Sequence, residues 1–133
     1  MRLSDCILAA TATMHVRDIA GRLAYNADGS PTTIELLPND AEQVQAAERA
    51  ALNRKLRNPQ KLRMSAEELD EDGIEKLAAA TASWNTFEGE DGEPIPCTLV
   101  NSRAIYKQHR WLREQVDAFV GERANFLPKS ATS

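Results

Sequence analysis

Two cysteines and two histidines are the residues of this chain that could most readily ligate a metal or form a nucleophilic pair: Cys6, His15, Cys97 and His109. Structural zinc sites present paired ligands two to four residues apart, and none of these four side chains has such a neighbour. A Cys–His nucleophile is allowed by composition, but no local motif supports it. We therefore predict no metal, no cofactor and no catalytic residue here, and expect free thiols rather than a disulfide.

Two acidic stretches could in principle bind calcium. An EF-hand loop requires glycine at its sixth position and glutamate at its twelfth. With Gly73 in the sixth position the twelfth residue is Ala79, and with Gly92 it is Thr98, so both registers fail. The sequence also lacks the G-x-x-x-x-G-K-[ST], G-x-G-x-x-G, G-x-S-x-G and H-E-x-x-H motifs. We predict that the protein is not an enzyme.

Composition places the chain among soluble globular proteins. Its 133 residues are 42% hydrophobic and 27% charged, with a net charge of −4. This size predicts a single domain over residues 1–127, followed by a disordered tail at 128–133. The negative charge argues against nucleic acid or an anionic membrane as the main partner, and no window approaches the roughly 20 apolar residues of a membrane span. We expect a cytosolic protein without a secretion signal.

Residues 1–38 are expected to form a small antiparallel β-ribbon. Residues 10–17 alternate apolar and polar side chains, residues 32–37 are β-prone, and turn formers fill residues 26–31. We predict that residues 23–26 pair with residues 32–37, with residues 10–17 alongside. So small a ribbon must pack on helices to be stable.

Residues 39–127 are expected to form a bundle of three to four helices, which makes the fold class α+β. Asp40 is predicted to cap the first helix, and Pro59 to stop it. A second helix, opened by a capping box at Ser65, is predicted to run as far as Trp84. Because the first helix is basic and the second acidic, we predict an antiparallel αα-hairpin with complementary charges.

Two further helices are expected after the acidic turn at residues 90–93. Thr98 is predicted to cap a short helix that runs through Tyr106. The last helix, at about residues 110–122, places an apolar stripe on one face. That stripe consists of Leu112, Val116, Phe119 and Val120.

Most of the large aromatic surface lies between Trp84 and Leu127, a run that holds both tryptophans and all three phenylalanines. Aromatic side chains bury about 150–250 Å² each, so we expect this run to be the core onto which the upstream part packs. Some of the rings are also candidates for contact with a partner, because Trp, Tyr and Arg dominate binding hot spots. Phe126 and Leu127 are expected to be the most exposed. The candidate protein-binding residues are Trp84, Phe87, Tyr106, Trp111, Phe119, Phe126 and Leu127.

The same run resembles the tail assembly chaperones of long-tailed bacteriophages and prophages. The resemblance is close over the last third of the chain, looser over the middle helices, and confined to the order of elements in the N-terminal part. The matching residues are Trp84, Gly92, Pro94, Pro96, Asn101, Trp111, Arg113, Gln115, Val116, Phe119, Arg123, Asn125, Phe126 and Leu127.

This resemblance implies a non-catalytic viral tail assembly chaperone that works through protein–protein interaction in the host-cell cytoplasm. It implies binding to the tape measure protein and recruitment of tail tube protein during virion assembly, with absence from the mature virion. Self-association into a homo-oligomer is left open.

The alternative hypothesis is a small regulatory protein that binds nucleic acid. Basic side chains between Arg49 and Arg63 could lie on phosphates. The acidic neighbouring helix, the negative net charge and the absence of a turn resembling helix-turn-helix argue against it. A third option is a structural component of the virion, which would remain in purified particles.

Overall fold

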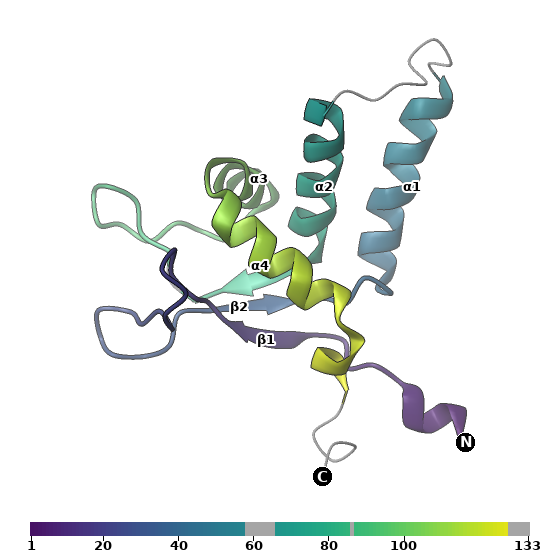
Figure 1. The fold of residues 1–133 in the computed structure, drawn as a ribbon. Coiled ribbons are helices and arrows are strands. Elements are labelled where there is room, and N and C mark those ends of the chain that lie inside the picture. The colour runs from purple at the N-terminus through teal and green to yellow at the C-terminus, as the bar shows by residue number, and fades with distance from the viewer. Residues whose placement is uncertain (58–65, 86, 128–133) are drawn as a thin grey trace.

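A computed structural model describes residues 1–57, 66–85 and 87–127 of the chain. Within these residues the fold is α+β: a three-stranded antiparallel sheet carries the helices on one side (Figure 1). The elements are η1 (Leu3–Cys6), β1 (Ala12–His15), β2 (Thr33–Leu36), α1 (Glu42–Arg57), α2 (Ala66–Ala80), β3 (Thr81–Trp84), α3 (Leu99–Gln108), α4 (Arg110–Gly121) and η3 (Arg123–Phe126). None of the described helices is both long and apolar enough to cross a bilayer.

The sheet has β2 in the middle, with β1 and β3 antiparallel on either side. Met14 pairs with Ile34, and Ile34 pairs with Trp84, so one face of the sheet is apolar and covered. Successive side chains of a strand point to opposite faces, so Thr13 and Glu35 lie on the other face. There the Thr13 hydroxyl donates to the Glu35 carboxylate at 2.5 Å. The alternation expected from residues 10–17 is therefore present.

The predicted ribbon is antiparallel and has residues 10–17 alongside it, but residues 23–26 do not pair along residues 32–37 as predicted. β2 pairs with β1, whereas residues 23–25 form only isolated bridges, Arg17 with Leu23 and Tyr25 with Pro31. Burial explains the choice of partner. β1 contributes Met14, which is buried, whereas Leu23 and Tyr25 remain exposed.

The second helix ends earlier than predicted, and the β-structure is not confined to residues 1–38. α2 stops at Ala80, and the next four residues form β3. Threonine, serine and tryptophan are poorer helix formers than the alanines before them, and β-branched and aromatic side chains favour strands. The strand also has partners that a longer helix would lose: Leu37 N–H donates to the Ala80 carbonyl at 2.7 Å, and the Trp84 indole N–H donates to the Ile95 carbonyl at 2.8 Å.

The predicted αα-hairpin is present, with α1 and α2 side by side and antiparallel (Figure 1). Its complementary charges form two ion pairs between the helices, Arg54–Asp72 at 3.4 Å and Lys76–Glu48 at 3.7 Å. Such partly exposed pairs contribute about 0–1 kcal/mol each, so they favour this arrangement without dominating its stability.

Asp40 does not cap the first helix. α1 begins at Glu42, and the Asp40 carboxylate instead accepts hydrogen bonds from Arg123 at 2.8 and 3.0 Å. A bidentate guanidinium is a stronger partner for a carboxylate than one backbone N–H, which explains the outcome. The predicted stop at Pro59, the capping residue Ser65 and the tail at 128–133 lie outside the described residues.

The two remaining helices match the predictions. Thr98 caps α3, its hydroxyl accepting from the Asn101 N–H at 3.1 Å. α4 buries Leu112, Val116 and Val120 on one stripe, with Phe119 partly buried.

One hydrophobic core joins the sheet to the helices. Ile34 and Leu36 of β2 are fully buried in it, so the upstream part is integral to the core rather than a layer packed on the aromatic run. The buried cluster consists of Met14, Val16, Ile34, Leu36, Val44, Ile74, Leu77, Ala80, Ile105, Tyr106, Leu112, Val116, Val120 and Phe126.

Candidate functional site

The candidate binding residues do not gather into one exposed surface. Tyr106 and Phe126 are 0% exposed and belong to the core. The others are partly buried: Trp84, Phe87, Trp111, Phe119 and Leu127. The four rings among these pack against the core cluster. The aromatic run is therefore mainly structural, and Tyr106 and Phe126 cannot contact a partner in this conformation.

The expectation that Phe126 is exposed is wrong because η3 folds the chain back after α4. The Phe126 ring meets Phe119 edge-on, with centroids 5.6 Å apart. The backbone N–H of Ala9 donates to the Phe126 carbonyl at 2.7 Å, which ties this segment to the N-terminal part. Leu127 is half-buried beside it.

The buried hydroxyl of Tyr106 lies 2.6 Å from the Thr81 hydroxyl, which links α3 to the start of β3. Burial raises the pKa of Tyr106 to about 12, although the Thr81 hydrogen bond lowers it. Burial likewise raises the pKa of the Cys97 thiol, against the lowering effect of a hydrogen bond with Ser102. A thiol held protonated is a poor nucleophile, and the contact with Thr81 satisfies the buried Tyr106 hydroxyl.

Trp84 anchors the acidic turn. Its ring meets Phe87 edge-on at 5.2 Å, its indole N–H donates to Ile95, and Ile95 N–H donates to the Phe87 carbonyl at 2.7 Å. Gly92 at φ 77° turns the chain between them. The two rings therefore pack at the base of the acidic turn, whose acidic residues remain in solvent.

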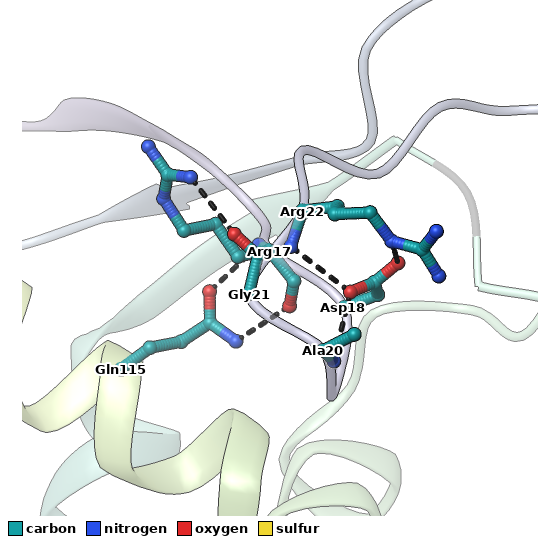
Figure 2. A network of polar contacts seen from close by, with 6 residues as sticks. All are labelled: Arg17, Asp18, Ala20, Gly21, Arg22 and Gln115. Atoms are coloured by element: carbon teal, nitrogen blue, oxygen red, sulfur yellow. Dashed lines mark hydrogen bonds and ion pairs between the residues drawn. The ribbon is translucent and has the colours of Figure 1, made fainter.

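A second turn, at residues 17–22, is closed by its own hydrogen bonds (Figure 2). One carboxylate oxygen of Asp18 accepts from the N–H groups of Ala20 and Arg22 at 2.9 and 3.0 Å. The Arg17 guanidinium donates to the carbonyl of Gly21 at 2.9 Å. This turn presents Ile19, whose exposed fraction is 79%.

Gln115 of α4 holds that turn in place (Figure 2). Its side-chain oxygen accepts from the Arg17 N–H at 2.8 Å, and its side-chain nitrogen donates to the Arg17 carbonyl at 2.9 Å. In the sequence Gln115 is only one of the residues that carry the resemblance, and nothing there predicts a role for it. Its role here is to position the turn.

Exposed apolar side chains lie on the helices, at positions outside the set of candidate binding residues. Leu52 and Leu56 of α1 are exposed, although they stand at helical spacing from Val44, and of the α1 side chains only Val44 is buried. The composition of α1 after Val44 held a signal, because alanines and charged residues give too little apolar volume for an enclosed helix. Leu99 and Val100 are exposed in the first turn of α3.

A groove of about 740 Å³ lies between α2 and α3, and we call it the α2–α3 groove. Ile74 and Glu75 line it from α2, and Val100, Arg103, Ala104 and Lys107 line it from α3. Arg103 Nε lies 2.7 Å from the Glu75 carboxylate, an ion pair whose geometry is not that of a hydrogen bond. The groove therefore combines apolar and charged side chains of both signs.

The basic face of the nucleic-acid hypothesis is partly neutralised. Arg49 pairs with Glu42, and Arg54 pairs with Asp72. Lys61 and Arg63, the last two residues of that face, lie outside the described ranges.

The four candidate metal ligands are separated along the fold. Cys6 ends η1, His15 ends β1, Cys97 precedes α3 and His109 separates α3 from α4. Both cysteines are free. In the part of the chain that the structure describes, no three Cys, His, Asp or Glu side chains are grouped so that they could hold a metal ion.

Comparison of the chain with protein-family models, with curated proteins and with solved structures found no match.

Proposed function

We propose that this chain is a non-catalytic tail assembly chaperone of a long-tailed phage or prophage. It would bind the tape measure protein and recruit tail tube subunits in the host cytoplasm, and it would not remain in the mature virion. The observation that carries the proposal is the exposure of Val100 and Leu99 on α3, and of Leu52 and Leu56 on α1, in a small protein with a net charge of −4.

The physical reason for such a chaperone is that a free tape measure protein is prone to aggregate. Its long helices expose apolar stripes before the tube encloses them, and exposed apolar surface promotes aggregation. A partner that binds the exposed form lowers the population of free, aggregation-prone chains. Apolar side chains on helices could cover such stripes, while the surrounding charges keep the complex soluble.

The surface chemistry favours a protein partner over nucleic acid. Arg49 and Arg54 of the basic face already pair with carboxylates. A phosphate would have to displace those carboxylates to bind the two arginines. Binding to phosphates also weakens steeply with salt, whereas apolar contacts do not.

Co-expression with the tape measure protein of the same phage tests the proposal. We expect the two proteins to co-purify at both low and high salt, and we expect this chain to be absent from purified particles. Its presence in the particles would indicate a structural virion protein. Failure to bind the tape measure protein, with salt-sensitive retention on DNA, would indicate the nucleic-acid alternative.

A further inference from the structure

β1 lies at one edge of the sheet, and part of its backbone has no partner among the described residues (Figure 1). The N–H of Val16, just after β1, donates to the Thr32 carbonyl of the neighbouring chain segment at 2.9 Å. Because backbone groups alternate in direction along a strand, those of Met14 also face β2, and those of Thr13 and His15 face away from the sheet. No hydrogen bond within the described residues reaches these four N–H and C=O groups, which we call the β1 edge.

The chain on either side of the β1 edge is held by groups from outside the sheet. Before the strand, the Ala9 N–H donates to the Phe126 carbonyl of η3 at 2.7 Å. After it, the side-chain amide of Gln115 on α4 takes both backbone groups of Arg17. The β1 edge is therefore open only over a short stretch between two contacts that lie outside the sheet.

A hollow of about 490 Å³ lies between β1 and α4. His15 and Arg17 line it from the strand side, and Ala118, Phe119 and Glu122 are among the residues that line it from the helix side. Ala118 is exposed and Phe119 is partly buried, so the hollow offers apolar surface that an added side chain can reach. An edge strand beside a helix, with room between them, suits the addition of an extended peptide as a further strand.

We propose that the β1 edge binds one extended segment of a partner protein by strand addition. The groups that identify this occupant are the unpaired N–H and C=O groups of Thr13 and His15, which are complementary to another backbone in strand conformation. Side chains at alternate positions of the added strand would lie on the same face as Met14, and an apolar one would enter the hollow beside Phe119.

A second copy of this chain fits the β1 edge less well than a single strand. η3 and the Gln115 side chain reach the edge from outside at its two ends, so two such edges would be kept apart by these groups on both copies. The binding mode also does not depend on a tape measure protein, so its test is separate from that of the proposed function.

The probe is a capped pentapeptide of alternating threonine and valine, titrated to millimolar concentration into the isotope-labelled full chain and followed by NMR. We expect the amide resonances of Thr13 and His15 to shift as the peptide binds, and their hydrogens to exchange several-fold more slowly, because they gain acceptors. Two further peptides carry N-methyl groups, one on its threonines and the other on its valines. Only one alternate set of N–H groups can face the β1 edge, so one of these peptides should bind about tenfold more weakly or worse, while the other keeps its affinity.

Thr13→Pro removes a donor from the β1 edge itself, and Thr13→Ala is its matched control. Both variants lose the hydroxyl that donates to Glu35, but only proline lacks the N–H. Proline is tolerated on an edge strand where the N–H faces solvent, and circular dichroism checks that the variant folds. We expect the proline variant to lose most of its affinity for the peptide and the alanine variant to keep it. If the proline variant does not fold, the two N-methylated peptides still decide the question.

Equal binding of the two N-methylated peptides would overturn the proposal, because recognition would then not involve the main chain. Shifts that leave out Thr13 and His15, or no shifts at all, would overturn it as well. Stable dimers that protect these two amides without peptide would place a second copy on the edge instead. None of these results touches the chaperone proposal, and a failure to bind the tape measure protein would leave the β1 edge unaffected.

Discussion

Gln115 and Arg17, 98 residues apart in the chain, are joined by two hydrogen bonds. The side-chain amide of Gln115 accepts from the backbone N–H of Arg17 and donates to its carbonyl, as the backbone of a neighbouring strand would. Asn85 does the same beside β2, accepting from the Thr33 N–H at 2.9 Å and donating to the Pro31 carbonyl at 2.6 Å. Both amides satisfy backbone groups at the end of a strand or just beyond it. The sheet is thereby attached to α4 and to the segment after β3.

Replacing Gln115 by leucine should lower the free energy of unfolding by about 1–2 kcal/mol, because two hydrogen bonds to the Arg17 backbone are lost. Urea unfolding measures the change, and the Arg17 amide should exchange its hydrogen faster. Gln108→Leu is the control, since Gln108 is exposed near the end of α3. Equal losses in the two variants would show that the Gln115 amide contributes no specific stability.

Thr98→Ala should cost about 1 kcal/mol of stability, because the first turn of α3 loses the hydroxyl that accepts from Asn101. Thr98→Ser keeps a hydroxyl and should recover most of the loss. Thermal unfolding compares the three proteins. A serine variant as unstable as the alanine variant would mean that the cap is not the cause.

Tyr106 should titrate at about pH 12. The raised pKa means that the folded state keeps its phenolic proton above the pH at which the unfolded chain loses it. The contribution of Tyr106 to stability is therefore complete below about pH 10 and is lost as pH rises from there toward its folded pKa. Absorbance titration of Tyr25→Phe, which leaves Tyr106 as the only tyrosine, measures this directly. A midpoint near about 10 would show that the hydroxyl is not buried.

Stability should fall in acid because hydrogen bonds hold two carboxyl groups ionised. The Arg123 guanidinium lowers the pKa of Asp40, and the hydroxyls of Thr11 and Thr13 lower the pKa of Glu35. Their contribution is present above the unfolded pKa, at about 4, and is lost as pH falls through the lower folded values. The effect is modest because Asp40 is exposed and Glu35 is only partly buried.

Asp40→Asn tests the acid dependence, because it removes the titrating group while keeping a similar shape. Urea midpoints at about pH 6 and about pH 3 should differ less for this variant than for the wild type. Asp117→Asn, at an exposed position on α4, should leave the difference unchanged. The same pH dependence in all three proteins would exclude the Asp40–Arg123 pair as a source of acid sensitivity.

Local spacing was enough to predict the elements whose partners lie near in sequence. The α4 stripe follows from the intervals between Leu112, Val116 and Val120, and the α3 cap from a hydroxyl three residues before an amide. The complementary charges of α1 and α2 could also be predicted, because the two helices are consecutive in the chain. These features need no knowledge of distant contacts.

The errors arose where a distant partner decides the structure. The apolar period of α2 continues through Trp84, yet pairing with β2 ends the helix at Ala80. Asp40 has the position of a helix cap in the sequence, but its carboxylate accepts a hydrogen bond from Arg123, 83 residues away. Phe126 is predicted to be exposed because it lies beyond the last helix, but η3 packs it against Phe119.

The candidate site shows the same limit. Aromatic side chains predict where burial is needed, but not which of them remain at the surface. Val100 carries no sequence signal that separates it from the buried apolar residues of α3, and only the composition of α1 pointed to the exposure of Leu56.

The most direct measurement is the soluble amount of tape measure protein, by sedimentation after synthesis, with and without this chain. We predict that the full chain keeps most of the tape measure protein in the supernatant, and that Val100→Glu, which places a carboxylate among the exposed apolar side chains of α3, leaves more of it in the pellet. A tape measure protein that sediments to the same extent with and without the wild-type chain would contradict the proposed chaperone function.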